Sequence, residues 1–244
     1  MIHRFFALAT LLVVIFPFFP AFSQNVKMFV NSGTGFIVSR SGHIITNLHV
    51  VDFCERITVR GAVTPRVAKI VGRDVRHDLA LLKINPTGSK LGSFRDVSLP
   101  VEKGERAVVV GYPGRAGMTG KTVTREAEIT NTKGPQGEDT WVQLSDLVEQ
   151  GNSGGPLMDA SGNVIGVVAA KAVIYSYKQS DPKNGTFTNS GIAIATPVVK
   201  QFLDRYRVPY YHSKEARPLS SSQLTSKAKR FVVNVHCESS TEVR

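Results

Sequence analysis

The sequence has little or nothing of several features that define common protein classes. Its 244 residues include only two cysteines, too few for a small fold that depends on many disulfides. No Cys/His cluster has the spacing of a zinc site, so we expect neither a metal nor another cofactor. The 21 glycines and 12 prolines show no fixed period, which excludes a collagen-like chain. Beyond the N-terminus no run approaches the roughly 20 apolar residues of a membrane-spanning helix, which excludes a polytopic membrane protein.

Residues 1–23 have the pattern of a secretory signal peptide. Arg4 lies in a short basic start, residues 5–16 are apolar except for one threonine, and Ala21 and Ser23 are small residues that suit cleavage after Ser23. The alternative is an uncleaved anchor, because residues 5–22 are just long enough to span a bilayer. No other stable membrane anchor is expected. In both cases the rest of the chain would be exported, to the periplasm or as a secreted protein.

Positive charge exceeds negative charge in the chain as a whole. There are 30 Lys and Arg against 19 Asp and Glu, and removal of residues 1–23 lowers the net charge only from +11 to +10. Such an excess could attract nucleic acid or another anionic surface. However, the basic residues are scattered, and only residues 60–76 and 227–230 are locally dense. We therefore interpret the charge as a solvated basic surface and expect no nucleic-acid partner.

Most of the chain has the pattern of short β-strands separated by turn residues. Gly, Asp, Asn and Ser clusters separate the aliphatic runs, and Ser41-Gly42 and residues 159–163 suit hairpin connections. The pattern predicts an all-β barrel or sandwich. The predicted strands cover residues 27–30, 35–38, 44–46, 57–59, 68–71, 79–84, 107–110, 122–130, 140–144, 156–158, 164–170 and 191–195.

One helix is predicted late in the chain, over residues 197–206. Thr196 suits the N-cap and Pro197 the first helical position. Apolar residues then recur at helical spacing and would form one buried face: Val198, Val199, Phe202, Leu203 and Tyr206.

A break in the strand pattern near residues 99–104 divides the body into two lobes of similar size. They cover about 25–100 and 104–196, so the main domain runs over 24–206. Residues 207–244 differ in composition, and we interpret them as a linker or a loosely docked extension that ends in a strand at 231–235.

The loop Gly151-Asn152-Ser153-Gly154-Gly155-Pro156 carries the strongest chemical signal. A nucleophilic serine needs a tight turn with backbone N–H groups aimed at the oxyanion that forms beside it, and glycines permit that close approach. Ser153 is therefore the candidate nucleophile. The N–H groups of Gly151 and Ser153 are the candidate oxyanion donors.

A serine hydroxyl also needs a base, and the base needs an acid that orients it. His49 follows one apolar strand and Asp78 precedes another. A lone histidine in such a place is usually a core residue, whereas an unpaired buried carboxylate is costly and implies a partner. The order His, Asp, Ser with separations of 29 and 75 residues favours a catalytic triad.

At these residues the chain resembles the trypsin-like serine peptidases, and specifically their HtrA/Deg-type branch. The resemblance implies two packed six-stranded antiparallel β-barrels, chymotrypsin-like, with a C-terminal helix and an active site between the barrels. It also implies that His49 is the general base, that Asp78 orients it and that Ser153 is the nucleophile. The similar segments are 33–38, 46–51, 77–82, 108–113, 151–156, 164–166 and 191–197.

The chain departs from that family in three places. Asn152 stands where digestive relatives carry an Asp that pairs with a new N-terminus, so we expect no activation by N-terminal insertion. Ser145 stands eight residues before Ser153, where the family often has an Asp, and Asp146 follows it, so the local loop conformation is open. Only about 38 residues follow the predicted helix, too few for a PDZ domain, so we expect none.

The same resemblance bears on substrate preference. Leu147, six residues before Ser153, falls where the floor of the primary specificity pocket lies in this fold, and Val148 and Ile192 would add apolar walls. We expect an apolar residue before the scissile bond, because no acidic group is placed to bind Lys or Arg.

The two cysteines, Cys54 and Cys237, leave two alternatives. In an exported protein an even pair is compatible with a disulfide, which here would attach the C-terminal extension to the first lobe. The other alternative is two separate thiols, with Cys54 simply buried.

We hypothesise an exported serine endopeptidase that cleaves polypeptide substrates through a Ser-His-Asp triad and an acyl-enzyme. The alternative is a catalytically inactive protein of the same fold that binds peptides or anions. All three triad positions are filled, which favours the enzyme. The oligomeric state stays open, although many HtrA-type proteins are trimers.

Overall fold

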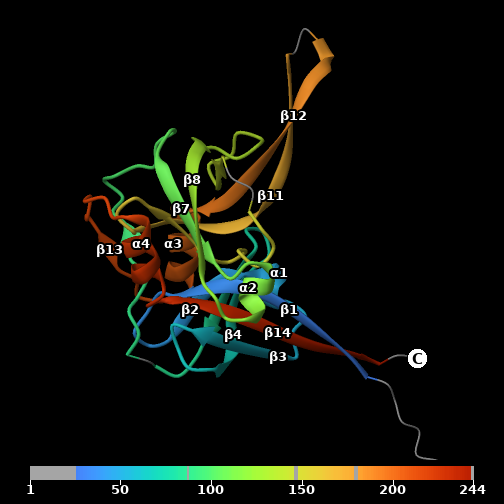
Figure 1. Cartoon of the computed structure of the whole chain (residues 1–244), viewed down its shortest axis with the longest axis vertical. Helices are drawn as coiled ribbons and strands as arrows, with labels where there is room; N and C mark the ends of the chain where they lie inside the picture. Colours follow the sequence, from blue (N-terminus) through green and yellow to red (C-terminus); the bar gives the residue numbers. More distant parts are fainter. Residues whose placement is uncertain (1–25, 87, 146–147, 179–180, 243–244) are drawn as a thin grey trace, which may run out of the picture.

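The computed structural model describes residues 26–86, 88–145, 148–178 and 181–242. The predicted signal peptide lies outside these residues. Within the described ranges, no helix combines the length and the apolar character that crossing a bilayer requires. The expected all-β fold is confirmed: two antiparallel barrels lie against each other, with short helices at their surfaces (Figure 1).

The first barrel is closed by six strands in the order β1-β14-β3-β4-β5-β2. Five of them come from the N-terminal half of the chain. Their buried residues lie on two faces, because one set packs inside the barrel and the other packs toward the second barrel. The six strands are β1 (Val26–Ile37), β2 (His43–Asn47), β3 (Arg56–Gly61), β4 (Arg66–Asp74), β5 (Leu79–Lys83) and β14 (Val232–Glu242).

The C-terminal strand β14 belongs to this first barrel, so residues 207–244 are more than a trailing extension. β14 pairs with β1 over the whole stretch from Val26↔Glu242 to Phe36↔Val232, and on its other side it pairs with β3. The sequence placed two strands in the region where the single strand β1 lies, because Asn31, Ser32 and Gly33 interrupt its apolar pattern. The sixth strand of the barrel comes instead from the end of the chain.

The second barrel contains six strands in the order β10-β7-β8-β9-β12-β11, and a β10–β11 pairing closes it. Two short strands, β6 (Phe94–Arg95) and β13 (His212–Ser213), extend the sheet beyond β11. The hairpin β11–β12 is much longer than predicted and projects from the body of the barrel (Figure 1). The six strands are β7 (Arg106–Gly111), β8 (Val123–Asn131), β9 (Trp141–Leu144), β10 (Pro156–Asp159), β11 (Val164–Lys178) and β12 (Asp181–Ala195).

The predicted helix is α3 (Thr196–Arg205), which begins one residue earlier than expected, with Ala195 as the N-cap. Its apolar face is buried as predicted, apart from Tyr206, which ends the helix and stays partly exposed. The other helices of the described chain are short: α1 (Leu48–Val51), α2 (Gly114–Met118) and α4 (Ser221–Ala228).

One apolar cluster joins the two barrels. It contains Phe36 and Leu81 from the first barrel, Val110 and Met158 from the second, and Phe202 from α3, all of them buried. Separation of the barrels would expose this shared core to water, so the packing fixes their relative position. The junction is where the candidate site lies.

Candidate active site at the junction of the barrels

His49 and Asp78 are brought together by two neighbouring strands of the first barrel. β2 and β5 are antiparallel, with Asn47 opposite Leu79, so the residue just before β5 lies next to the helix that follows β2. The Nδ1 atom of His49 lies 2.6 Å from the Oδ2 atom of Asp78. The backbone N–H of His49 donates to the other carboxylate oxygen at 2.9 Å. The carboxylate therefore fixes both the ring and the main chain of His49.

The backbone of Asp78 is held in an uncommon conformation. Its φ of 54° lies in the left-handed region, which aspartate tolerates better than most residues. Its carbonyl accepts hydrogen bonds from the N–H of Leu48 at 3.0 Å and from Nδ2 of the buried Asn47 at 2.9 Å. These two donors come from the segment that carries His49, so they hold the carboxylate against the imidazole.

A second His–Asp pair stabilises the turn that precedes Asp78. The carboxylate of the buried Asp74 accepts hydrogen bonds from the backbone of His77 and lies 3.0 Å from its ring, while Arg205 of α3 approaches to 3.5 Å. Burial alone would raise the pKa of Asp74, but these hydrogen bonds and charges lower it overall. The ionised carboxylate thus connects the turn to α3. The sequence analysis did not predict a role for Asp74, because neither its residue type nor its spacing from other residues matches a known motif.

The loop that carries Ser153 is fitted closely against the first barrel. Gly154 has a φ of +84°, and a Cβ atom there would lie 2.2 Å from the carbonyl oxygen of Thr34 and 2.3 Å from Oγ1 of Thr46. Only glycine permits this approach. The N–H of Thr34 donates to the carbonyl of Ser153 at 2.9 Å, so strand β1 binds the loop directly.

Thr34 also fixes the part of the loop that precedes the serine. Its buried hydroxyl donates to the carbonyl of Gly151 at 2.6 Å and accepts from the N–H of Tyr112 at 3.0 Å. Gly151 has a φ of +97°, which a residue with a side chain would rarely adopt. Sequence reasoning missed Thr34, and the available signal was weak: a threonine between two glycines, Gly33 and Gly35.

The structure brings the Ser153 loop and the His49 helix to the same place. A Cβ atom on Gly33 would lie 2.7 Å from Cγ1 of Val50 and 3.1 Å from the carbonyl oxygen of Ser153. The hydroxyl of Ser153 donates to the carbonyl of Ala169 at 3.0 Å. Within the described residues it forms no hydrogen bond to His49.

The two candidate oxyanion donors have no backbone acceptor in the described part of the chain. Among the residues that the structure describes, no backbone carbonyl accepts a hydrogen bond from the N–H of Gly151 or Ser153. This is compatible with the expected role of the two N–H groups, which is to bind a developing negative charge. Within the described residues of the whole structure, no group of three or more His, Cys, Asp or Glu residues could hold a metal ion.

The predicted specificity pocket is only partly described. Leu147 lies outside the described residues. Val148 is buried in the apolar cluster of the second barrel, beside Ile129 and Leu144, and Ile192 is half-buried on β12. Of the two predicted pocket residues that the structure describes, Ile192 is partly open to solvent and Val148 is buried.

Cys54 and Cys237 are joined in a disulfide in the structure, with their Cα atoms 5.2 Å apart. The bond links the segment just after α1 to the middle of β14. Of the two alternatives that the sequence left open, the structure has the bonded pair. The C-terminal strand is therefore attached covalently close to His49.

Comparison with known proteins gives consistent results. Residues 33–167 match the family described as Trypsin-like peptidase domain. The chain is 33% identical over 212 residues to the uncharacterized protein y4bJ of Sinorhizobium fredii, covering 85% of this chain and 32% of that protein. It is 38% identical over 184 residues to a probable periplasmic serine endoprotease, DegP-like, of Brucella suis, covering 72% of this chain and 33% of the relative. The chain thus spans about a third of the length of the curated relatives it matches.

Solved structures with the same fold include two proteases. The serine endoprotease from Yersinia pestis superposes with a TM-score of 0.56 at 26% identity, covering 74% of this chain and 61% of that one. The HtrA-type protease AlgW, solved with a decapeptide, gives a TM-score of 0.57 at 25% identity, with 70% and 50% covered.

Proposed function

The chain belongs to the trypsin-like peptidase family, as an HtrA/DegP-type member, and from this premise we propose that it is an exported serine endopeptidase. The observation that carries the proposal is the pair formed by His49 and Asp78, 2.6 Å apart, beside a serine loop that is hydrogen-bonded to the adjoining strand β1. A structural role alone would not require an exposed imidazole, and the side chain of His49 is 48% exposed.

In the proposed reaction Ser153 Oγ attacks the carbonyl carbon of the scissile peptide bond while its proton passes to Nε2 of His49. Asp78 holds Nδ1 and stabilises the imidazolium that forms. The N–H groups of Gly151 and Ser153 would bind the oxyanion. The intermediate then releases the amine, which takes the proton from His49, and leaves an acyl-enzyme. Water, deprotonated by His49, hydrolyses the ester and restores Ser153.

The first step requires a change at Ser153. Its hydroxyl must leave the carbonyl of Ala169 and turn toward His49. Catalytic hydrogen bonds are often long or misaligned without substrate and tighten only when substrate binds. Rotation about the Cα–Cβ bond of Ser153 would break the hydrogen bond to Ala169 and redirect the hydroxyl.

Polypeptides are the proposed substrates and the periplasm the proposed location. The relatives support both, since one is named a probable periplasmic endoprotease and another was solved with a bound decapeptide. An apolar residue before the scissile bond remains our proposal, with Leu147 and Ile192 lining the pocket, because Val148 is buried in the core of the second barrel. No cofactor enters the proposed mechanism.

A non-catalytic binding protein is the second candidate, and one observation favours it. The Ser153 hydroxyl is bonded to Ala169 rather than to His49. The two candidates differ in one property, because only an activated serine beside a working oxyanion site reacts rapidly with a fluorophosphonate. Fast labelling of the native protein supports the peptidase, and absence of labelling supports the binding protein.

The decisive experiment combines this label with peptide cleavage. Ser153→Ala should remove labelling and lower turnover by about 10⁶-fold, while peptide binding stays nearly unchanged, because a triad acts as a unit. Ser98→Ala is the matched control, since Ser98 is an exposed serine outside the candidate site whose hydroxyl bonds to Asp96. Near-normal cleavage by Ser153→Ala would refute the assignment.

A further inference from the structure

A large basic pocket lies where the C-terminal segment meets the first barrel. Its volume is about 780 Å³, within the range of small-molecule sites. Arg40 comes from the turn between β1 and β2, and Lys90 from the segment between β5 and β6. Lys227 comes from α4, and Arg230 from the connection to β14. None of the three triad residues lines it.

The pocket holds several positive charges and no carboxylate among its described lining residues. Arg40, Lys90 and Arg230 are exposed, and none of them forms an ion pair or a side-chain hydrogen bond within the described part of the chain. Arg95, by contrast, is paired with Glu105 and Asp159. Three unpaired cations around one concavity leave a strong positive potential there.

Lys227 adds to this charge although it is half-buried. Its ammonium group donates to the carbonyl of Ser161 at 2.9 Å. Burial lowers its pKa most, the nearby Asp159 and Glu215 oppose this, and the positive charge of Arg230 lowers it further. Lys227 and Arg230 therefore repel each other, and an anion between them would relieve that repulsion.

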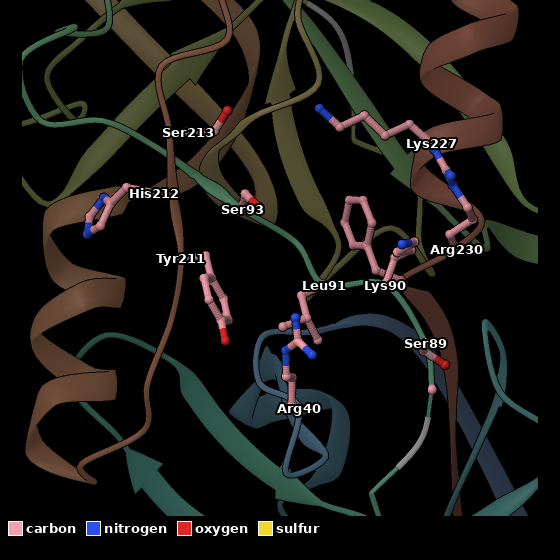
Figure 2. Close-up of a pocket in the computed structure, with 12 residues that line it drawn as sticks. Arg40, Ser89, Lys90, Leu91, Ser93, Tyr211, His212, Ser213, Lys227 and Arg230 are labelled. Atoms are coloured by element: carbon pink, nitrogen blue, oxygen red, sulfur yellow. The ribbon is translucent and has the colours of Figure 1, made fainter.

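The remaining walls supply hydroxyl and apolar groups. Figure 2 shows the side chains of Arg40, Leu91 and Tyr211 converging on one part of the pocket, with Lys227 and Arg230 across from them. Ser93 and Ser213 contribute hydroxyls, and the buried Phe231 is part of the lining. His212 points away from the other labelled side chains, so we leave it out of the site.

From this arrangement we propose that the pocket binds a small ligand carrying two or more phosphate groups. Guanidinium groups match phosphate oxygens with two parallel hydrogen bonds, and the site offers two of them, together with two ammonium groups and hydroxyl donors. Because the lining comes from both the first barrel and the C-terminal segment, the bound ligand would hold these two parts together. The site does not depend on the proposed peptidase activity, since binding needs no turnover.

The test uses the mature full-length chain and two probes of phosphate chemistry. Isothermal titration with inorganic tripolyphosphate represents a free ligand, and flotation with phosphatidylcholine vesicles, with and without cardiolipin, represents a lipid headgroup that carries two phosphate groups. We expect the variant Arg40→Gln/Arg230→Gln to bind the probe about 100-fold more weakly or not at all, because it loses two charge-assisted contacts. Since both residues are exposed, its melting temperature without ligand should stay unchanged.

The variant Lys69→Gln/Lys229→Gln is the matched control. It removes the same number of positive charges from exposed positions outside the pocket, one of them directly beside Arg230. If tripolyphosphate binds and only the pocket variant loses this binding, the result supports a free phosphate ligand. If only the vesicles with cardiolipin show this pattern, the result supports a lipid headgroup. Binding of neither probe, or equal weakening in both variants, overturns the proposal.

Discussion

Removal of the disulfide is the most informative perturbation of the fold, and Cys54→Ala/Cys237→Ala accomplishes it. The cysteines are 183 residues apart in the sequence, so their bond closes a very long loop in the unfolded chain. Loop-closure entropy for that length corresponds to about 5 kcal/mol at 25 °C. Measured losses for natural disulfides in small secreted domains are about 2–5 kcal/mol, so we expect the variant to lose an amount in that range. For a domain of this size the melting temperature should fall by roughly 4–20 °C.

Urea unfolding of the mature protein measures this loss. The midpoint should move to lower urea while the slope of the transition stays similar, unless the unfolded state expands strongly without the cross-link. Wild-type protein incubated with reductant should approach the stability of the variant. The variant itself should not respond to reductant, which separates loss of the bond from any other effect of the reducing agent.

The same variant tests how the link affects the candidate site. Cys54 follows α1 closely, and α1 carries His49. We therefore expect fluorophosphonate labelling of the folded variant to be slower than in wild type, although every triad residue is present. Equal unfolding midpoints for wild type and variant, together with no effect of reductant on wild type, would show that the two cysteines are not bonded in solution.

Three further predictions concern residues that position the site. Thr34→Val should lower kcat about 10- to 100-fold, because the Gly151 carbonyl loses its buried donor, and Thr34→Ser should largely restore it. Gly154→Ala should abolish labelling, whereas Gly120→Ala, also at positive φ but with open space around it, should label normally. Because the pKa of Asp74 is lowered, its carboxylate stabilises the fold above about pH 4 and this contribution disappears as pH falls through the lowered value. Asp74→Asn should thus flatten the acid limb of a stability–pH curve measured by thermal melting, and an unchanged limb would contradict the argument.

The fold class followed from local patterns, but the membership of the first barrel did not. The alternation of apolar and turn residues located most strands because it reflects burial on one face. The same pattern wrongly predicted two strands where β1 is continuous, because Asn31 and Ser32 interrupt the apolar run. In the structure, backbone pairing with β14 keeps β1 continuous through this interruption. The partner lies about 200 residues away in the sequence, and no local property of either strand specifies such a distant pairing.

For the site, the sequence led to the three side chains expected to react but not to the residues that hold them. His49, Asp78 and Ser153 lie in short motifs whose residue types are tied to chemistry. Thr34 and Asp74 act through hydrogen bonds to backbone and neighbouring groups, and threonine or aspartate in such places is usually structural. Their roles depend on which segments meet in three dimensions.

The two halves of the candidate site share one mechanical support, which is strand β14. On one side β14 pairs with β1, opposite Gly33 and Thr34, and β1 binds the Ser153 loop. On the other side Cys237 of β14 is bonded to Cys54, close behind the helix of His49. Displacement of β14 would therefore disturb the proposed nucleophile and the proposed base together, although neither belongs to β14. The C-terminal segment thus helps to position the residues of the candidate site. The same segment also lines the basic pocket, and its pocket residues Lys227 and Arg230 come just before β14 in the sequence.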